Sequence, residues 1–216
     1  FQRMTGYRLI THYGTVGAVN EWAIAGEEAD LIISSSRSMR RLVHQGKIKA
    51  GSETAICETS IGIVTAAGIE LSVASVDEFK RALVAAKVIV YADPARGGAA
   101  GIHVAKVIGQ LGLSEQLKPK LRLAAGGDVT EVTLSLGPGA LGITQISEIA
   151  DKPQAQLIAP LPEELQNYTV FIAGVPANSP QSDGAAALLK FLRSPKVIAV
   201  IRAKGMKDFG SNGGSE

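Results

Sequence analysis

The sequence predicts an α/β fold with mostly parallel sheets and flanking helices, and two observations lead to this prediction. Short segments rich in Ile, Val and Leu alternate along the chain with segments that carry helix-capping patterns. Several of the apolar segments also lack the polar–apolar alternation of a half-exposed strand, which is typical of strands that are buried on both faces. Alternating strands and helices favour parallel sheets with helices on their faces.

Apolar runs define the predicted strands. These strands lie, in chain order, at residues 9–13, 31–34, 55–65, 88–92, 141–144, 156–159 and 169–175. Each is rich in Ile, Val or Leu, the residues that fill the core around a buried sheet.

Capping patterns define the ends of the predicted helices. Ser75 with Glu78 three residues later has the form of a capping box, in which two side chains satisfy the first N–H groups of a helix. Asp128 with Glu131 has the same form, and Ser194 precedes a proline that suits the first helical position. The glycines that we expect to end helices are Gly26, Gly46, Gly112 and Gly205.

The composition excludes several classes of function. Of the 216 residues, 22 are Lys or Arg and 20 are Asp or Glu, so the formal net charge of +2 favours neither a nucleic-acid surface nor a polybasic membrane patch. Aromatic residues make up 5% of the chain, which disfavours a base-stacking surface. No apolar run reaches the roughly 18 residues of a membrane-spanning helix. The single cysteine, Cys57, is expected to be a buried structural thiol.

Three glycine-rich junctions are the strongest functional signal. They lie at residues 13–17, 93–101 and 125–129, and each leads into a predicted helix. Small residues there expose backbone N–H groups at a helix N-terminus, where the helix dipole also favours negative charge. Because ligands gather at the carboxyl ends of parallel strands, the three junctions together predict a cradle for an anion. The alternative is that the glycines only make tight turns.

Familiar nucleotide and metal motifs are missing. The glycines at residues 97–101 are not followed by the Gly-Lys-Ser/Thr of a phosphate-binding loop, and they do not match G-x-G-x-x-G. No two histidines have metal-ligand spacing, and no nucleophile–base pair is evident. We therefore expect neither a cofactor nor a metal.

Arg96 and His103 are the side chains that we expect to face a ligand. Arg96 lies in the second junction, where a guanidinium can make paired hydrogen bonds to a carboxylate or oxyanion; the alternative is a solvent-facing loop residue. His103 lies near the start of the helix that follows. His12 is interpreted as a packing residue in a strand and His44 as a helix cap. Ser34 and the two serines after it are expected to cap a helix, with ligand contact as the alternative.

Several motifs resemble those of periplasmic molybdate-binding-like proteins. In chain order they are Ala-Gly-Glu-Glu-Ala-Asp-Leu-Ile-Ile (25–33), Tyr-Ala-Asp-Pro (91–94), Ala-Gly-Ile-His (100–103), Leu-Gly-Ile (141–143) and Leu-Pro (161–162) before Tyr168. The resemblance covers nearly the whole chain in the right order. It implies the two-lobed, type II fold of an ABC importer's solute-binding protein, with the ligand between the lobes.

The resemblance also implies a division of the chain. One lobe is expected to hold residues 1–58 and 169–216 and the other residues 59–168, with hinges near 58–61 and 161–168. The family's first strand and most of its first helix are expected to be missing ahead of the first residue. A periplasmic or extracytoplasmic location is implied, with a signal peptide that is not in this chain.

The family's oxyanion contacts can be carried over to matching positions only. With the two side chains named above, the expected ligand-binding residues are Thr15, Val16, Gly17, Arg96, Gly98, Ala100, His103, Val129 and Gln145. Thr15 supplies one hydroxyl where the family usually has more, and Gln145 stands where molybdate binders have a tyrosine. These differences favour a larger polar anion, such as a di- or tricarboxylate, over molybdate.

Two functions follow from the resemblance. The first is a monomeric binding protein without enzymatic activity, which captures a small anion and delivers it to an ABC permease of the inner membrane. The alternative is an isomerase of a small tricarboxylic acid, similar to aconitate isomerase, with His103 or Glu148 as the catalytic base. A ligand-sensing domain of a transcription regulator is disfavoured, because the sequence has no helix-turn-helix segment and no basic patch.

Overall fold

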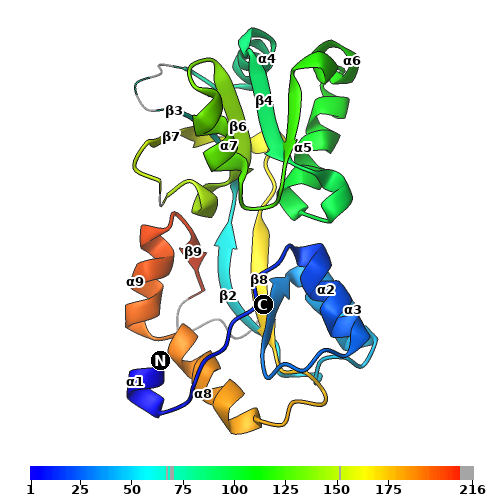
Figure 1. Ribbon diagram of the computed structural model, residues 1–216, viewed down its shortest axis with the longest axis vertical. Coiled ribbons are helices and arrows are strands. Elements are labelled where there is room, and N and C mark those ends of the chain that lie inside the picture. The colour runs from blue at the N-terminus through cyan, green and yellow to red at the C-terminus, as the bar shows by residue number, and fades with distance from the viewer. Residues whose placement is uncertain (67, 69–70, 151, 210–216) are drawn as a thin grey trace. The chain divides into compact units, whose positions relative to one another are not determined.

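The computed structural model of the chain describes residues 1–66, 68, 71–150 and 152–209 (Figure 1). These residues form two compact units. The first unit combines Phe1–Glu58 with the chain from Thr169 onward, and the second unit is Thr59–Tyr168. Each unit has its own sheet and its own hydrophobic core.

The sheet of the second unit has the strand order β5-β4-β6-β3-β7. Its strands are β3 (Ile61–Ala66), β4 (Val88–Ala92), β5 (Leu121–Ala124), β6 (Ala140–Gln145) and β7 (Ala155–Pro160). Strand β4 pairs in parallel with β5 and β6, whereas β3 pairs antiparallel with β6 and β7. Strand β3 is therefore the reversed strand of an otherwise parallel sheet.

The sheet of the first unit has the strand order β1-β8-β2-β9. Its strands are β1 (Ile32–Ser35), β2 (Thr54–Thr59), β8 (Thr169–Gly174) and β9 (Lys207–Asp208). Strand β1 pairs antiparallel with β8, and β2 pairs antiparallel with β9. The α/β class is confirmed, but the sheets are mixed rather than mostly parallel. Strand β3 enters the second unit's sheet directly from β2 of the other sheet, after a single residue, and it runs antiparallel to both of its neighbours, β6 and β7.

Helices cover both faces of the second unit's sheet. They are α4 (Val76–Ala85), α5 (Ala99–Gln110), α6 (Ser114–Leu117) and α7 (Val129–Leu136), with 3₁₀ turns η1 (Pro94–Arg96), η2 (Lys118–Lys120), η3 (Ile146–Glu148) and η4 (Glu163–Leu165). Alternate residues of β4 face opposite sides: Ile89 and Tyr91 pack with α4 and α5, whereas Val90 and Ala92 pack with the start of α7. Burial on both faces explains the unbroken apolar run of this strand.

The helices of the first unit pack in two groups. They are α1 (Gln2–Thr5), α2 (Val16–Ala25), α3 (Ser36–His44), α8 (Ser182–Leu192) and α9 (Pro195–Ala203). Helices α2 and α3 form a core with β1 around Met39 and Leu42, whereas α8 and α9 pack against β2 and β8 around Ile56 and Cys57. Burial raises the pKa of the Cys57 thiol to about 11, so the expectation of a buried thiol is confirmed.

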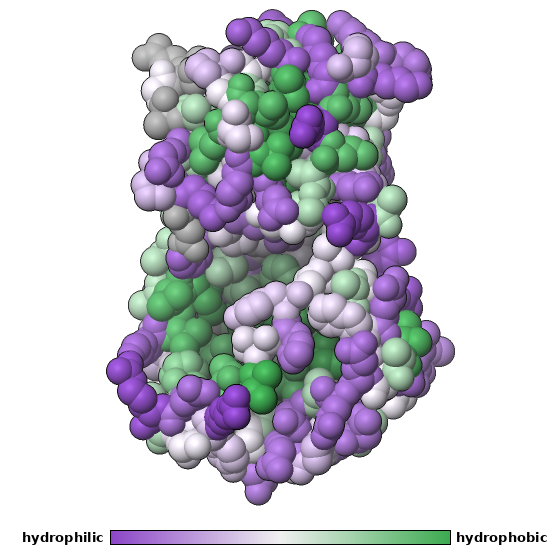
Figure 2. Space-filling view, viewed as in Figure 1, coloured by the Kyte–Doolittle hydropathy of each residue, from purple (hydrophilic) through white to green (hydrophobic). Residues whose placement is uncertain are grey.

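Residues 9–13 do not form the predicted strand. They lie in an irregular segment in which Ile10 is 68% and Tyr13 is 87% exposed, and His12 is exposed rather than packed in a sheet. Figure 2 shows hydrophobic side chains on the face of the first unit that this segment crosses. A strand is stable only beside other strands, and a short apolar run does not show whether a partner strand is available.

The helix signals have mixed outcomes. The capping box at Ser75 is confirmed, because the Glu78 N–H donates to the Ser75 hydroxyl over 3.2 Å. Asp128 and Ser194 precede α7 and α9 as predicted, but neither side chain makes a capping hydrogen bond. The predicted strand at residues 55–65 is two strands, β2 and β3, which are separated at Ser60.

Candidate functional site

The carboxyl ends of β4, β5 and β6 lie at one edge of the second unit's sheet, because these strands run parallel. The Asp93 N–H, just after β4, donates to the carbonyl oxygen of Ala124 at the end of β5 over 2.9 Å, which ties the two ends together. Helix α5 follows β4, helix α7 follows β5, and the two helices cover opposite faces. Both N-termini therefore reach this edge, which is where ligands bind in parallel α/β sheets.

The second glycine-rich junction shapes the start of α5. The Asp93 side chain accepts a hydrogen bond from the Ala95 N–H over 3.0 Å, and the η1 turn ends at Gly97 with a positive φ of 73°. Gly98 is the N-cap of α5, and in the part of the chain that the structure describes no side chain caps it. The N–H groups of the first turn, which includes Ala100, have no partner within the helix and are available to an anion.

Gly101 determines how closely α5 approaches β4. A Cβ atom at this position would collide with the carbonyl oxygen of Ala92, the last residue of β4. A glycine is therefore required for the first turn of α5 to pack directly on the end of the strand.

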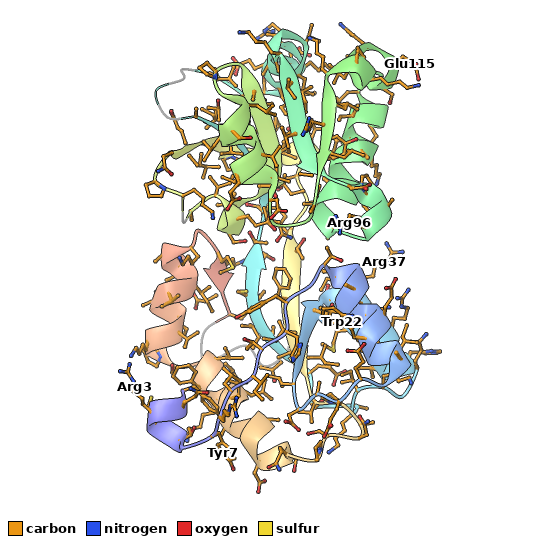
Figure 3. All side chains as sticks on the ribbon, viewed as in Figure 1. Arg3, Tyr7, Trp22, Arg37, Arg96 and Glu115 are labelled. Atoms are coloured by element: carbon orange, nitrogen blue, oxygen red, sulfur yellow. The ribbon has the colours of Figure 1, made fainter. Side chains whose placement is uncertain are left out.

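Arg96 and His103 have different roles in the structure. Arg96 ends the η1 turn, and its side chain is exposed at the surface of the second unit (Figure 3). His103 is half-buried, and its Nε2 lies 2.7 Å from the Leu165 carbonyl oxygen. Because a carbonyl only accepts, Nε2 carries the proton and donates it. His103 therefore links α5 to the η4 turn, and this bond occupies one of its two ring nitrogens.

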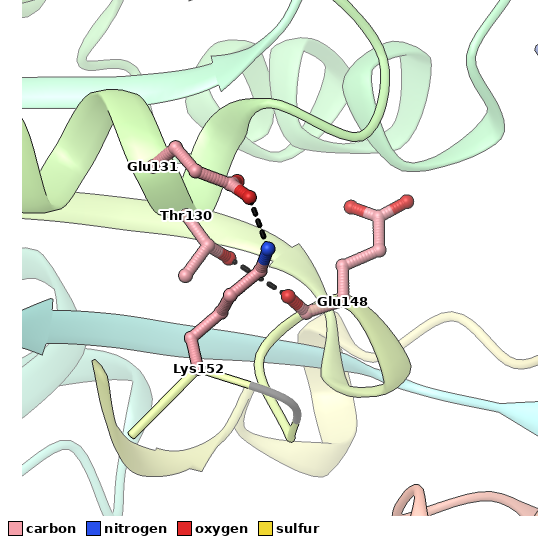
Figure 4. A network of polar contacts seen from close by, with 4 residues as sticks. All are labelled: Thr130, Glu131, Glu148 and Lys152. Carbon is pink, nitrogen blue, oxygen red and sulfur yellow. Dashed lines mark hydrogen bonds and ion pairs between the residues drawn. The ribbon is translucent and has the colours of Figure 1, made fainter. Parts of the chain in front are cut away.

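The third junction positions the start of α7. Val129, its first residue, is fully buried, and the Thr130 hydroxyl donates to the backbone oxygen of Glu148 over 3.1 Å (Figure 4). Glu131 forms an ion pair with Lys152, and the hydrogen bond from this lysine lowers the pKa of Glu131. Two hydrogen-bonded or ionic links thus hold the first turn of α7 to the segment that follows β6.

Gln145 and Glu148 lie beyond β6 at the same edge. Gln145 ends the strand and is half-buried. Glu148 lies in the short η3 turn, and its carboxylate accepts a hydrogen bond from the Thr144 hydroxyl. Burial raises the pKa of Glu148; the Thr144 bond opposes this, and the carboxylates of Glu131 and Asp128 raise the pKa further.

The first junction lies in the first unit, at the start of α2. Thr15 is the N-cap, and its hydroxyl accepts a hydrogen bond from the Ala18 N–H over 3.2 Å. Val16 and Gly17 are the first two residues of the helix, and both are half-buried. The hydroxyl of Thr15 therefore stabilises the helix in addition to any contact with a ligand.

A family model now identifies the fold. The model of the bacterial extracellular solute-binding proteins matches residues 1–207. The chain belongs to this family. The predicted resemblance to periplasmic molybdate-binding-like proteins and the type II fold class are thereby confirmed. Family membership makes the chain a bacterial extracellular solute-binding protein, whose partner is a small ligand.

Relatives of this solute-binding protein include proteins with different ligands. An aconitate isomerase from a Pseudomonas species is 24% identical over 183 residues, which cover 84% of this chain and 68% of that protein. The periplasmic molybdate-binding protein of Azotobacter vinelandii has a TM-score of 0.76 and 18% identity over 95% of this chain and 89% of that one. Peb3 from Campylobacter jejuni has a TM-score of 0.67 and 14% identity over 96% of this chain and 90% of that one. A structure of PEB3 with L-phospholactate has a TM-score of 0.68.

The residues that the structure describes carry neither a metal-binding cluster nor a membrane-spanning helix. They contain no group of three or more His, Cys, Asp or Glu residues that is arranged to hold a metal ion. None of their helices has the length and apolar character to cross a membrane.

Several residues of the site were not predicted from the sequence. Thr130 and Thr144 hold Glu148 from two sides, and Asn20 accepts a hydrogen bond from the Ser38 hydroxyl between α2 and α3. Thr130 lies within the Asp128–Glu131 capping pattern and Thr144 directly follows the Leu-Gly-Ile motif, but neither pattern indicates a bond to Glu148. Their partners are known only once the strands and helices are assembled.

Proposed function

We propose that this solute-binding protein captures a small anion, and that the N-termini of α5 and α7 bind its negatively charged oxygens. The observation that carries the proposal is the start of α5, where Gly98 and Ala100 leave the N–H groups uncapped at the carboxyl edge of the sheet. The start of α7 at Val129 and the side chain of Gln145 lie at the same edge. Helix N-termini favour anions through their N–H groups and their dipole.

A small organic carboxylate is the ligand class that we favour over molybdate. Gln145 can donate and accept hydrogen bonds, which suits a ligand with several carboxylates or hydroxyls, and exposed Arg96 can pair with a further carboxylate. The names of the relatives support a small anion in general: one is an aconitate isomerase, one binds molybdate and one was solved with L-phospholactate.

The proposal includes a role in import. Acting as a monomer in the periplasm, the protein would release its anion to an ABC permease. In the first unit, Thr15, Val16 and Gly17 at the start of α2 are proposed to bind an anion through the same kind of helix N-terminus. The ligand would be bound without a covalent step.

A ligand panel tests the proposal. The purified chain is screened by thermal shift with cis-aconitate, trans-aconitate, citrate, molybdate and tungstate, and hits are quantified by calorimetry. We expect a tricarboxylate or dicarboxylate to raise the melting temperature with concentration, as linkage requires for a ligand that binds the folded state. Tight molybdate or tungstate binding without any response to organic acids would overturn the carboxylate assignment. No response to any anion would overturn the proposed function.

The second candidate function is isomerisation of aconitate, and Glu148 is the observation that favours it. Its carboxyl is half-buried beside the start of α7, and burial raises its pKa, as a proton-transferring group requires. His103 is a weaker candidate because its Nε2 is bonded to Leu165. Incubation with cis- or trans-aconitate, followed by ultraviolet absorbance, distinguishes the two functions. Interconversion that is lost in Glu148→Gln would replace the pure binding role with catalysis.

A further inference from the structure

Ser34 carries a buried hydroxyl that the fold does not use. The residue is 1% exposed, and its Oγ has no hydrogen-bond partner among the described residues. Buried polar groups are nearly always paired, because an unpaired one destabilises the folded state. An unpaired buried hydroxyl is therefore expected to have a partner outside the chain, such as a bound water, an ion or a ligand.

Ser34 lies where α3 begins and beside α2. Side chains alternate along a strand, so Ser34 shares the face of β1 on which Ile32 packs against α2 and α3. The next residue, Ser35, is the N-cap of α3. The Ser38 hydroxyl, in the first turn of α3, donates to the Asn20 side chain of α2 over 3.0 Å, so these parts of the two helices lie side by side (Figure 1).

The charges around this place favour an anion. Helices α2 and α3 have ten and nine residues, and each contributes the positive end of its dipole. Neither helix has an acidic residue in its first turn, and α3 carries Arg37 there (Figure 3). Helix α4 of the second unit differs, since Asp77 and Glu78 occupy its first turn.

We propose that the Ser34 hydroxyl donates a hydrogen bond to the carboxylate or oxyanion group of the ligand, beside the N-termini of α2 and α3. The inference rests on the proposed function and assigns it a further contact. The hydroxyl has no hydrogen bond within the described residues that must break before it binds the ligand. Ser34 would thus determine affinity rather than hold the fold together.

The test compares Ser34→Ala with Ser194→Ala. The Oγ of Ser194, at the N-cap of α9, is also buried without a partner among the described residues, which makes it a matched control. Each substitution removes an unsatisfied buried hydroxyl, so each should keep or slightly raise the melting temperature of the ligand-free protein. Calorimetry is carried out with whichever of citrate, cis-aconitate and molybdate the wild type binds. Only Ser34→Ala should raise the dissociation constant of this anion, by about tenfold or more.

A second variant, Asn20→Asp, keeps an acceptor for the Ser38 hydroxyl and adds a negative charge between α2 and α3. It should weaken anion binding, and added salt should reduce the difference from the wild type. If Ser34→Ala folds and binds the anion with wild-type affinity, the inference is overturned and the proposed function is left intact. If Ser34→Ala does not fold, wild-type affinity in Asn20→Asp overturns the inference in the same way. If the wild type binds none of the three anions, the proposed function fails and this inference fails with it.

Discussion

Helices α4 and α5 pack on the same face of the second unit's sheet, yet their N-termini are built differently. The start of α4 is closed by its own side chains. The Ser75 hydroxyl accepts from the Glu78 N–H, and the Glu78 carboxylate accepts from Ser72 and from the Ala74 N–H, both over 2.8 Å. The Ser72 and Ala74 bonds lower the pKa of Glu78. Helix α5 starts at Gly98 with neither a capping side chain nor an acidic first turn.

The two helix N-termini are suited to different tasks, the start of α4 to stabilising the fold and the start of α5 to binding a ligand. A capping box satisfies the donors of the first turn within the chain, so an external anion gains little there. A glycine N-cap followed by alanines leaves the same donors to a ligand, at some expense in helix stability. Under the proposed function, the second unit uses the start of α4 for folding and the start of α5 for recognition.

Gly101→Ala should have the largest effect, because it changes the position of the binding helix itself. The added methyl group collides with the Ala92 carbonyl oxygen, so we expect a loss of about 3 kcal/mol in the free energy of unfolding and a loss of anion binding. Urea denaturation and calorimetry measure the two effects. Gly109→Ala is the control in the same helix, since its nearest neighbour is the Ser114 hydroxyl at 3.9 Å. It should be neutral or stabilising by up to about 1 kcal/mol; equal effects of the two substitutions would contradict the close-packing explanation.

Ser75→Ala should change stability alone. Loss of the α4 cap is expected to cost about 1 kcal/mol in the free energy of unfolding, as N-cap substitutions to alanine typically do. The affinity for the anion should stay at the wild-type value in calorimetry, because α4 is not part of the proposed site. A clear loss of affinity in this variant would break the distinction between α4 and α5.

Glu148→Gln should have the smallest effect on stability, and this effect should depend on pH. Burial raises the pKa of Glu148, so the folded state holds this proton at pH values where the unfolded state has released it. The contribution of Glu148 to stability is therefore largest below its usual pKa and falls as pH rises through the folded-state pKa. Glu148→Gln should remove this fall and melt a few degrees higher than the wild type at neutral pH. If the melting temperatures of the two proteins change with pH in the same way from acidic to neutral pH, the raised pKa of a buried Glu148 carboxyl is contradicted.

Local chemistry could be predicted from the sequence, and non-local pairing could not. The capping box of Ser75 and the strand β4 at residues 88–92 were predicted correctly, because a few neighbouring residues determine each. Residues 9–13 have the composition of a strand but no strand pairs with them in the described part of the chain. Which partner a segment finds depends on the assembled sheet.

The site shows the same limit. The glycine-rich starts of α5 and α7 were located from the sequence; Gly98, for example, is the N-cap of α5. The hydrogen bond of His103 was not foreseen, since Leu165 lies 62 residues further along the chain. For Ser34 and the serines after it the sequence left helix capping and ligand contact open, and only the structure shows that Ser35 caps α3 while the Ser34 hydroxyl is buried without a partner among the described residues.

The most direct test of the central claim is the anion affinity of Gly98→Asp. Gly98 has an ordinary φ of −70°, and a Cβ there would meet only the Ala92 methyl group at 3.8 Å, so the variant should fold, and its aspartate should cap α5. Gly98→Asn adds the same cap without charge. If the start of α5 binds the anion, calorimetry with the preferred carboxylate should show at least about tenfold weaker binding for Gly98→Asp and a smaller loss for Gly98→Asn. Wild-type affinity in Gly98→Asp would contradict anion binding at the start of α5.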